Sequence, residues 1–102
     1  MARPRAWLWL WSLIILSTGA ALTRGPYVQS VTATSAIVIW RTDVPSDSRI
    51  EYGVGNYANS IADPNPTTEH VITLTDLITG TTVTYRVFSD QVELATGSFH
   101  TV

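Results

Sequence analysis

The sequence contains no cysteine and no lysine among its 102 residues. Without cysteine the chain forms no disulfide and carries no lipid anchor on an N-terminal cysteine, so a folded domain has to be stabilised by its apolar core alone. Its cationic side chains are arginines, and the formal net charge is −2. Binding to nucleic acid or to an anionic membrane surface needs a basic stripe, so we expect neither of them as a partner.

The sequence also lacks an apolar run long enough to cross a membrane comfortably. The longest run covers residues 6–16, whereas a membrane-spanning helix needs about 20 residues. Arg3 and Arg5 precede the run, and small residues follow it as far as Ala20 and Ala21. This order predicts a signal peptide over residues 1–21 and a secreted, periplasmic or extracellular location, with no membrane contact beyond export; the alternative is an uncleaved signal anchor.

The remaining residues, 22–102, are enough for one small domain. They hold four arginines and eight acidic residues, a formal charge of −4. Apolar residues at helical spacing are missing, and β-branched runs take their place. The strongest strand prediction is for residues 34–42, where period-2 geometry puts Ala36, Val38 and Trp40 on one face. Burial of a tryptophan is worth roughly 4–6 kcal/mol as an upper bound, so we expect Trp40 to be the main core anchor.

Turn clusters separate this strand from the other predicted strands. The clusters at residues 43–48 and 62–66 contain proline, aspartate and asparagine, which are typical of turns. The other clear strand patterns cover residues 27–32, 49–52, 69–74, 82–89 and 94–101. With residues 34–42, these are six clear strands, and residues 57–59 are too irregular to assign firmly. We therefore expect about seven short strands in all, which predicts an all-β fold, an immunoglobulin-like antiparallel β-sandwich. The expected core anchors are Trp40, Tyr52, Leu74, Leu77, Tyr85 and Phe99.

Short motifs are spread along this whole domain. They read GPYVQ at 25–29, TSA at 34–36, WRT at 40–42, SRIEYG at 48–53, HV at 70–71, LTDL at 74–77, GT at 80–81, YRV at 85–87 and SFHT at 98–101. With these motifs, residues 26–102 resemble a fibronectin type III-like domain. More narrowly, they resemble the N-terminal domain of purple acid phosphatases and related metallophosphoesterases.

The sequence departs from that family pattern at one corner of the sandwich. Such domains usually have proline where this chain has Thr79, and tyrosine where it has Val83. The tyrosine hydroxyl ties the corner back to the backbone. Its loss removes a hydrogen bond worth about 0.5–1.5 kcal/mol, so we predict a looser corner.

The resemblance does not extend to catalysis. In the family the enzyme lies in a following domain, where aspartates, histidines and an asparagine hold two metal ions. That ligand set is absent from this sequence, and His70 and His100 alone cannot supply it. We therefore expect a chain that is not an enzyme and binds no cofactor, and whose partner is a metallophosphatase domain or another protein.

Three other groups of polar residues contain the residue types of a functional site, and each also has a simpler explanation. His70 and His100 suit a metal ion or a pH sensor, but we expect solvated histidines at strand ends. Ser98, His100 and Asp90 contain the residue types of a hydrolase triad but lack a nucleophile elbow or oxyanion loop. The loop residues Asp43, Asp47, Asp63 and Asp90 offer oxygen ligands for calcium, although aspartate is an ordinary turn residue and their spacing matches no calcium loop.

The outward side of the strands carries the remaining candidate site. If Trp40 points inward, then Ile37 and Ile39 point away from the core, and Phe88 does the same on its own strand. Exposed apolar residues on one sheet indicate a docking face for a neighbouring domain or chain. The simpler reading is that β-branched residues favour strands and are shielded by their neighbours.

The sequence thus supports a preferred function and two alternatives. The preferred one is a non-catalytic exported module like the accessory domain of purple acid phosphatases, used for domain packing or protein interaction. One alternative is a free-standing extracellular fibronectin type III module that binds protein or glycan. The other alternative is an enzyme in its own right.

Overall fold

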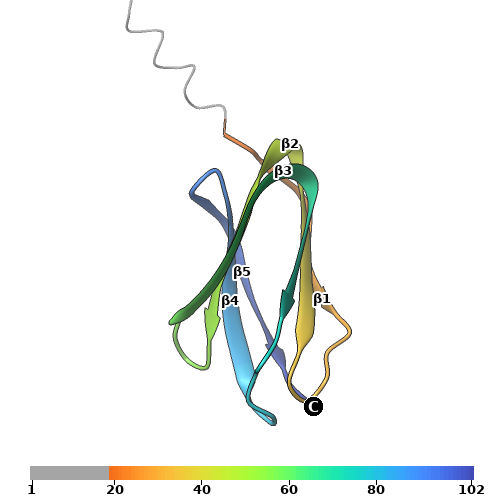
Figure 1. Cartoon of the computed structure of the whole chain (residues 1–102), viewed down its shortest axis with the longest axis vertical. Coiled ribbons are helices and arrows are strands. Elements are labelled where there is room, and N and C mark those ends of the chain that lie inside the picture. The colour runs from red at the N-terminus through yellow and green to blue at the C-terminus, as the bar shows by residue number, and fades with distance from the viewer. Residues whose placement is uncertain (1–18) are drawn as a thin grey trace, which may run out of the picture.

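The computed structural model describes residues 19–102, so the predicted signal peptide lies almost entirely outside the described residues. The described part is built from antiparallel strands (Figure 1). They are β1 (Leu22–Gln29), β2 (Ala36–Gly53), β3 (Asn59–Leu74), β4 (Thr82–Ser89) and β5 (Val92–His100). No helix within residues 19–102 is long and apolar enough to span a membrane.

The strands form a β-sandwich because β2 and β3 each run through both layers. In one layer the first half of β2 lies between β1 and the second half of β3, where Ile39 pairs with both Tyr27 and Val71. In the other layer the second half of β2 lies between the first half of β3 and β4, which pairs in turn with β5. The prediction of an antiparallel β-sandwich is therefore confirmed.

The predicted count of about seven strands is wrong, because residues 19–102 form five. The clusters at residues 43–48 and 62–66, which we expected to end strands, lie inside β2 and β3. The pairing of β2 with β3 shifts register between Arg41 and Ser46 and again between Ser46 and Ser48. Such irregularities bend a strand without ending it, and this bend carries both strands from one layer to the other.

The core lies between the layers and follows the predicted alternation. Ala36, Val38 and Trp40 are completely buried on one face of β2. Of the other expected anchors, Leu74, Leu77 and Tyr85 are buried, whereas Tyr52 and Phe99 are partly buried against the cluster. All five strands and this whole apolar cluster lie within residues 22–102.

The corner before β4, which we predicted to be looser, contains hydrogen bonds from threonine side chains. Val83 is buried, and threonine hydroxyls form other hydrogen bonds at this corner. Thr81 and Thr101 both donate to the carbonyl oxygen of Ile78, at 2.7 and 2.8 Å. Thr79 donates to the carbonyl oxygen of Val102 at 2.9 Å, so the end of the chain is held against this corner.

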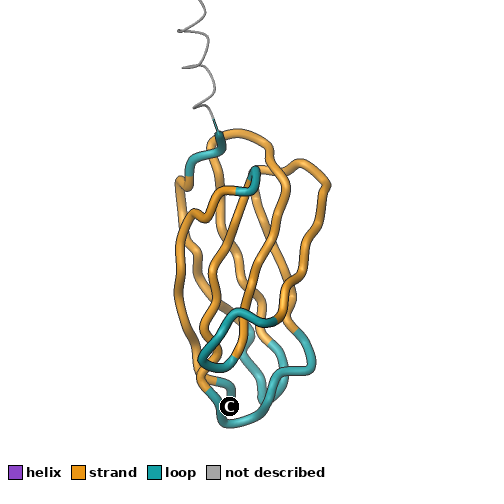
Figure 2. The backbone as a smooth tube through the Cα atoms, turned by 90° about the vertical axis from the view of Figure 1, so that its left-hand side faces the viewer, coloured by secondary structure: helices purple, strands orange, loops and turns teal. Residues whose placement is uncertain are grey.

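Most loop residues gather at the end of the sandwich where the C-terminus lies (Figure 2). The loops after β1, β2 and β3 all turn there, while the β4–β5 hairpin turns at the opposite end (Figure 1). We call the first of these ends the loop end, meaning residues 54–58 after β2, residues 75–81 after β3, and Val102.

Candidate functional site

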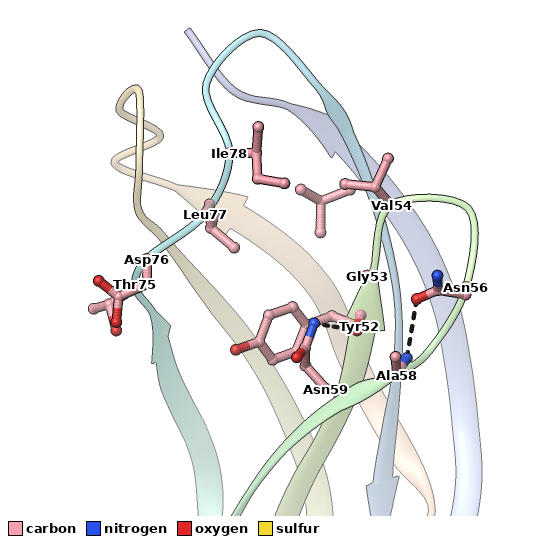
Figure 3. Close-up of a pocket in the computed structure, with 11 residues that line it drawn as sticks. Tyr52, Gly53, Val54, Asn56, Ala58, Asn59, Thr75, Asp76, Leu77 and Ile78 are labelled. Carbon is pink, nitrogen blue, oxygen red and sulfur yellow. Dashed lines mark hydrogen bonds between the residues drawn. The ribbon is translucent and has the colours of Figure 1, made fainter.

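A pocket of about 510 Å³ opens at the loop end, between the loop that joins β2 to β3 and the loop that joins β3 to β4 (Figure 3). Pockets of roughly 300–1,000 Å³ are the usual size for small-ligand sites. The lining residues are Tyr52, Gly53, Val54, Asn56, Ala58, Asn59, Thr75, Asp76, Leu77, Ile78 and Val83.

The apolar part of the pocket comes from the edge of the core and from the two loops. Leu77 and Val83 are buried and Tyr52 is half-buried, so they form the inner wall. Val54 and Ile78 belong to different loops and lie near one another across the opening (Figure 3). Their exposed fractions of 46% and 63% put them among the most exposed large apolar side chains of the described residues.

Two asparagines contribute amides that are already held in place. Asn56 accepts a hydrogen bond from the backbone N–H of Ala58 at 3.1 Å, and Asn59 donates to the carbonyl oxygen of Tyr52 at 3.4 Å (Figure 3). The other end of each amide has no hydrogen-bond partner in the described part of the chain. The pocket therefore combines an apolar wall with polar groups that remain available.

Asp76 is the one charged residue that lines the pocket. It lies with Thr75 on the β3 side of the pocket, and the hydroxyl end of Tyr52 points toward that side (Figure 3). Its φ of 57° is in the left-handed region, which aspartate and asparagine adopt more readily than most residues. The lining of the pocket thus includes an exposed aspartate, an aromatic ring and aliphatic side chains.

The predicted docking face of Ile37, Ile39 and Phe88 does not form. Ile37 is half-buried, and Ile39 is only 8% exposed because it lies on the central strand between Tyr27 and Val71. Phe88 belongs to β4 in the other layer, so the three residues do not share a face. Phe88 is itself 8% exposed.

Ion pairs and aromatic contacts cover the outward side of the second layer. The guanidinium of Arg49 lies 4.0 Å from the centre of the Phe88 ring. Arg86 pairs with Glu51 at 2.7 Å and stacks on the Tyr57 ring at 4.3 Å. These contacts explain the low exposure of Phe88, because long arginine side chains cover apolar surface while their charged ends stay wet.

His70 is buried, contrary to the prediction of a solvated histidine at a strand end. Its ring stacks on Trp40, with centroids 5.0 Å apart and planes within 6°. The Thr42 hydroxyl lies 2.9 Å from Nε2 and the Ser48 hydroxyl 2.7 Å from Nδ1, so both ring nitrogens are occupied. Burial lowers the pKa of His70, and the negative charges of Asp47 and Asp90 partly oppose this effect.

The alternation of the sequence contained a signal for this placement. His70 is in phase with Ile72 and Leu74, which we assigned to a strand with a buried face. The bonds to Thr42 and Ser48 could not be read from that pattern, since they depend on how β2 bends between the two layers.

The remaining candidate groups do not assemble. His100 is exposed, with Nδ1 3.1 Å from the Thr82 hydroxyl, and Asp90 lies beyond the opposite end of β5. No group of three or more potential metal-ligating side chains lies together within residues 19–102. The aspartates considered for calcium instead accept backbone N–H groups, as turn residues do; these are Asp43, Asp47, Asp63 and Asp90.

Comparison with known proteins shows the fold. No protein-family model and no curated protein matches this chain. Among solved structures, the sensor domain of the anti-sigma factor RsgI4 from Pseudobacteroides cellulosolvens is similar, with a TM-score of 0.58 and 18% identity over 84% of this chain and 97% of that one.

Two further solved structures are similar to the same degree. A redesigned β-sandwich protein has a TM-score of 0.61 and 21% identity, covering 76% of this chain and 90% of that one. A myokine has a TM-score of 0.62 and 23% identity, covering 81% of this chain and 95% of that one. At such identities the likeness establishes a shared β-sandwich fold, and the resemblance to purple acid phosphatases stays a prediction.

Proposed function

We propose that this chain is an exported, non-catalytic β-sandwich module that docks onto another protein domain. We further propose that it is related to the N-terminal accessory domain of purple acid phosphatases, because its motifs resemble that domain along residues 26–102. On this proposal the partner is a metallophosphatase domain, and the module packs against it without taking part in the reaction.

The observation that carries the proposal is the apolar surface at the loop end. Val54 and Ile78 are exposed by 46% and 63%. They come from separate loops and line the same pocket. Apolar side chains that gather on a surface in this way are typical of protein interaction sites.

The contacts of the buried histidine support a non-catalytic role. His70 is the one deeply buried imidazole, and hydroxyls occupy both of its nitrogens. A general base or a metal ligand needs a free nitrogen lone pair within reach of its substrate or metal. Here the imidazole stacks on Trp40, and its hydrogen bonds join β3 to β2.

The test is sedimentation velocity of residues 22–102 mixed with a metallophosphatase domain of the resembled family. We expect a complex, and we expect the double variant Val54→Ser/Ile78→Ser to weaken it by about tenfold or more, because two apolar side chains lose their burial. Val92→Ser is the matched control, since Val92 is 51% exposed and follows the hairpin at the opposite end of the molecule.

Three outcomes would decide between readings. A complex that Val92→Ser weakens as much as the double variant would contradict docking through the loop end. No complex with any metallophosphatase domain would contradict the accessory-domain proposal and favour a free-standing module. Phosphate-ester turnover by the purified chain with added iron, zinc or manganese would contradict the non-catalytic reading.

The pocket favours glycan binding as the second candidate function. Its half-buried Tyr52 ring and the free amide ends of Asn56 and Asn59 are the kinds of groups that contact sugar rings. A neutral oligosaccharide that shifts the NMR signals of these residues, in a chain that binds no phosphatase domain, would support this candidate.

A further inference from the structure

We infer that the pocket at the loop end receives a basic side chain, lysine or arginine, from the protein onto which the module docks. This inference deepens the proposed function and rests on it for the partner being a protein. It assigns to the pocket a ligand of defined chemistry, an organic cation on an aliphatic stem. Asp76 would pair with the cation, and the apolar wall would hold the stem.

The first argument is that Asp76 is the carboxylate that the fold leaves unused. Within residues 19–102, every other acidic side chain has a partner. Glu51, Glu69 and Glu93 form ion pairs with arginines. The other four aspartates each accept a backbone N–H (Ala20, Ala21, Asn65 and Asp90 are the donors). Asp76 has neither kind of contact in this part of the chain, although it lines the pocket.

The second argument is the chemistry of the other residues that line the pocket. Tyr52, Leu77 and Ile78 line the same pocket. Aliphatic stems of lysine and arginine pack on such surfaces while the charged end stays near water. A cation near the face of a tyrosine ring gains a further attraction of about 0.5–1 kcal/mol at exposed sites. A small inorganic cation would leave the apolar wall without contacts.

The third argument is the distribution of charge over the domain. Residues 22–102 carry a formal charge of −4 and no lysine. Three of their four arginines are in ion pairs away from the pocket, namely Arg41, Arg49 and Arg86. No basic residue lines the pocket. The field around the opening therefore favours a cationic ligand over a neutral or anionic one.

The test compares two probes that differ only in the charged group. N-acetyl-lysine-methylamide and N-acetyl-norleucine-methylamide share an aliphatic stem, and the second lacks the ammonium. Each is titrated into the full chain labelled with ¹⁵N, and the backbone signals of Asn59, Leu77 and Ile78 are followed. We expect the lysine probe to bind about two- to fivefold more tightly, the range of an exposed ion pair, and to lose this advantage at high salt.

Two variants assign the effect to one carboxylate. Asp76→Asn should remove the advantage of the lysine probe while leaving the spectrum otherwise intact, because asparagine adopts the left-handed conformation as readily as aspartate. Asp63→Asn is the matched control, since Asp63 is an exposed turn residue outside the pocket. It should leave the preference unchanged.

Several results would overturn the inference. They are equal binding of the two probes, a preference that survives Asp76→Asn, or an absence of shifts at the pocket with either probe. A neutral sugar that binds more tightly than the lysine probe would also overturn it and would favour the glycan candidate. The probes need no partner domain, so a failure here is distinguishable from a failure of the docking experiment.

Discussion

His70 shows how a single polar residue is accommodated at the centre of this small core. Its flat ring stacks on Trp40, and its two nitrogens form hydrogen bonds with the hydroxyls of Thr42 and Ser48. A neutral imidazole donates from one nitrogen and accepts at the other, and hydroxyls can complete both bonds. A protonated ring would be a charge in a buried site, so the folded protein favours the neutral form.

This environment predicts that stability falls as the pH is lowered. Burial depresses the pKa of His70 in the folded state, whereas in the unfolded chain it lies near 6.5. Below about pH 6.5 the unfolded state therefore binds the additional proton, and the free energy of unfolding falls by at most about 1.4 kcal/mol per pH unit. The loss stops growing once the pH passes below the folded-state pKa.

Urea unfolding at pH 7.5, 6.5 and 5.5 measures this slope. His70→Phe keeps an aromatic ring on Trp40 and should abolish the slope between these pH values, even though the variant is less stable overall. His100→Gln, at an exposed position, is the control and should keep the slope of the parent. A slope that persists in His70→Phe would show that another group titrates.

At the scale of elements, local patterns predicted the strands well and their ends poorly. Period-2 alternation placed Ala36, Val38 and Trp40 inward, as observed. The clusters at 43–48 and 62–66 led to a wrong prediction of strand ends. Proline and aspartate can lie inside a strand where an irregularity in the strand pairing bends it. The pocket could not be predicted from local patterns, since Val54 and Ile78 line it from two separate loops.

The turn of the β4–β5 hairpin contains a residue that is poorly suited to its backbone conformation, which suggests a stabilising substitution. Ser89 pairs with Val92, so Asp90 and Gln91 form a two-residue loop, with φ values of 55° and 64°. Both values match a type I′ turn, which favours asparagine or aspartate followed by glycine. Gln91→Gly should therefore raise the free energy of unfolding by about 0.5–1 kcal/mol.

Thermal or urea unfolding tests this prediction, with Thr96→Gly as the control. Thr96 is exposed in the regular part of β5, where glycine costs about 0.5–1 kcal/mol relative to alanine. The two substitutions should change stability in opposite directions. Equal losses in both variants would contradict the strain assigned to Gln91.

At the scale of the whole molecule, the continuity of β2 and β3 joins the two layers. Each strand supplies one half to each layer, so neither layer can separate without breaking strands of the other. No disulfide supports the fold, and domains of this size normally unfold in one step. The apolar cluster between the layers includes residues of both, among them Trp40 from one layer and Val87 from the other.

We therefore predict that a cavity in the second layer lowers the free energy of unfolding equally, whether unfolding is followed by a probe in the first layer or by one that reports on the whole domain. In residues 22–102, Trp40 is the one tryptophan, so its fluorescence reports on the first layer, while far-UV circular dichroism reports on all strands. Val87→Ala removes buried methyl groups from β4 and should cost about 1–3 kcal/mol. Both signals should shift to the same lower urea midpoint, because the layers unfold together. If the Trp40 transition stayed at its original midpoint while the circular dichroism transition moved, the two layers would be independent units and the shared strands would not couple them.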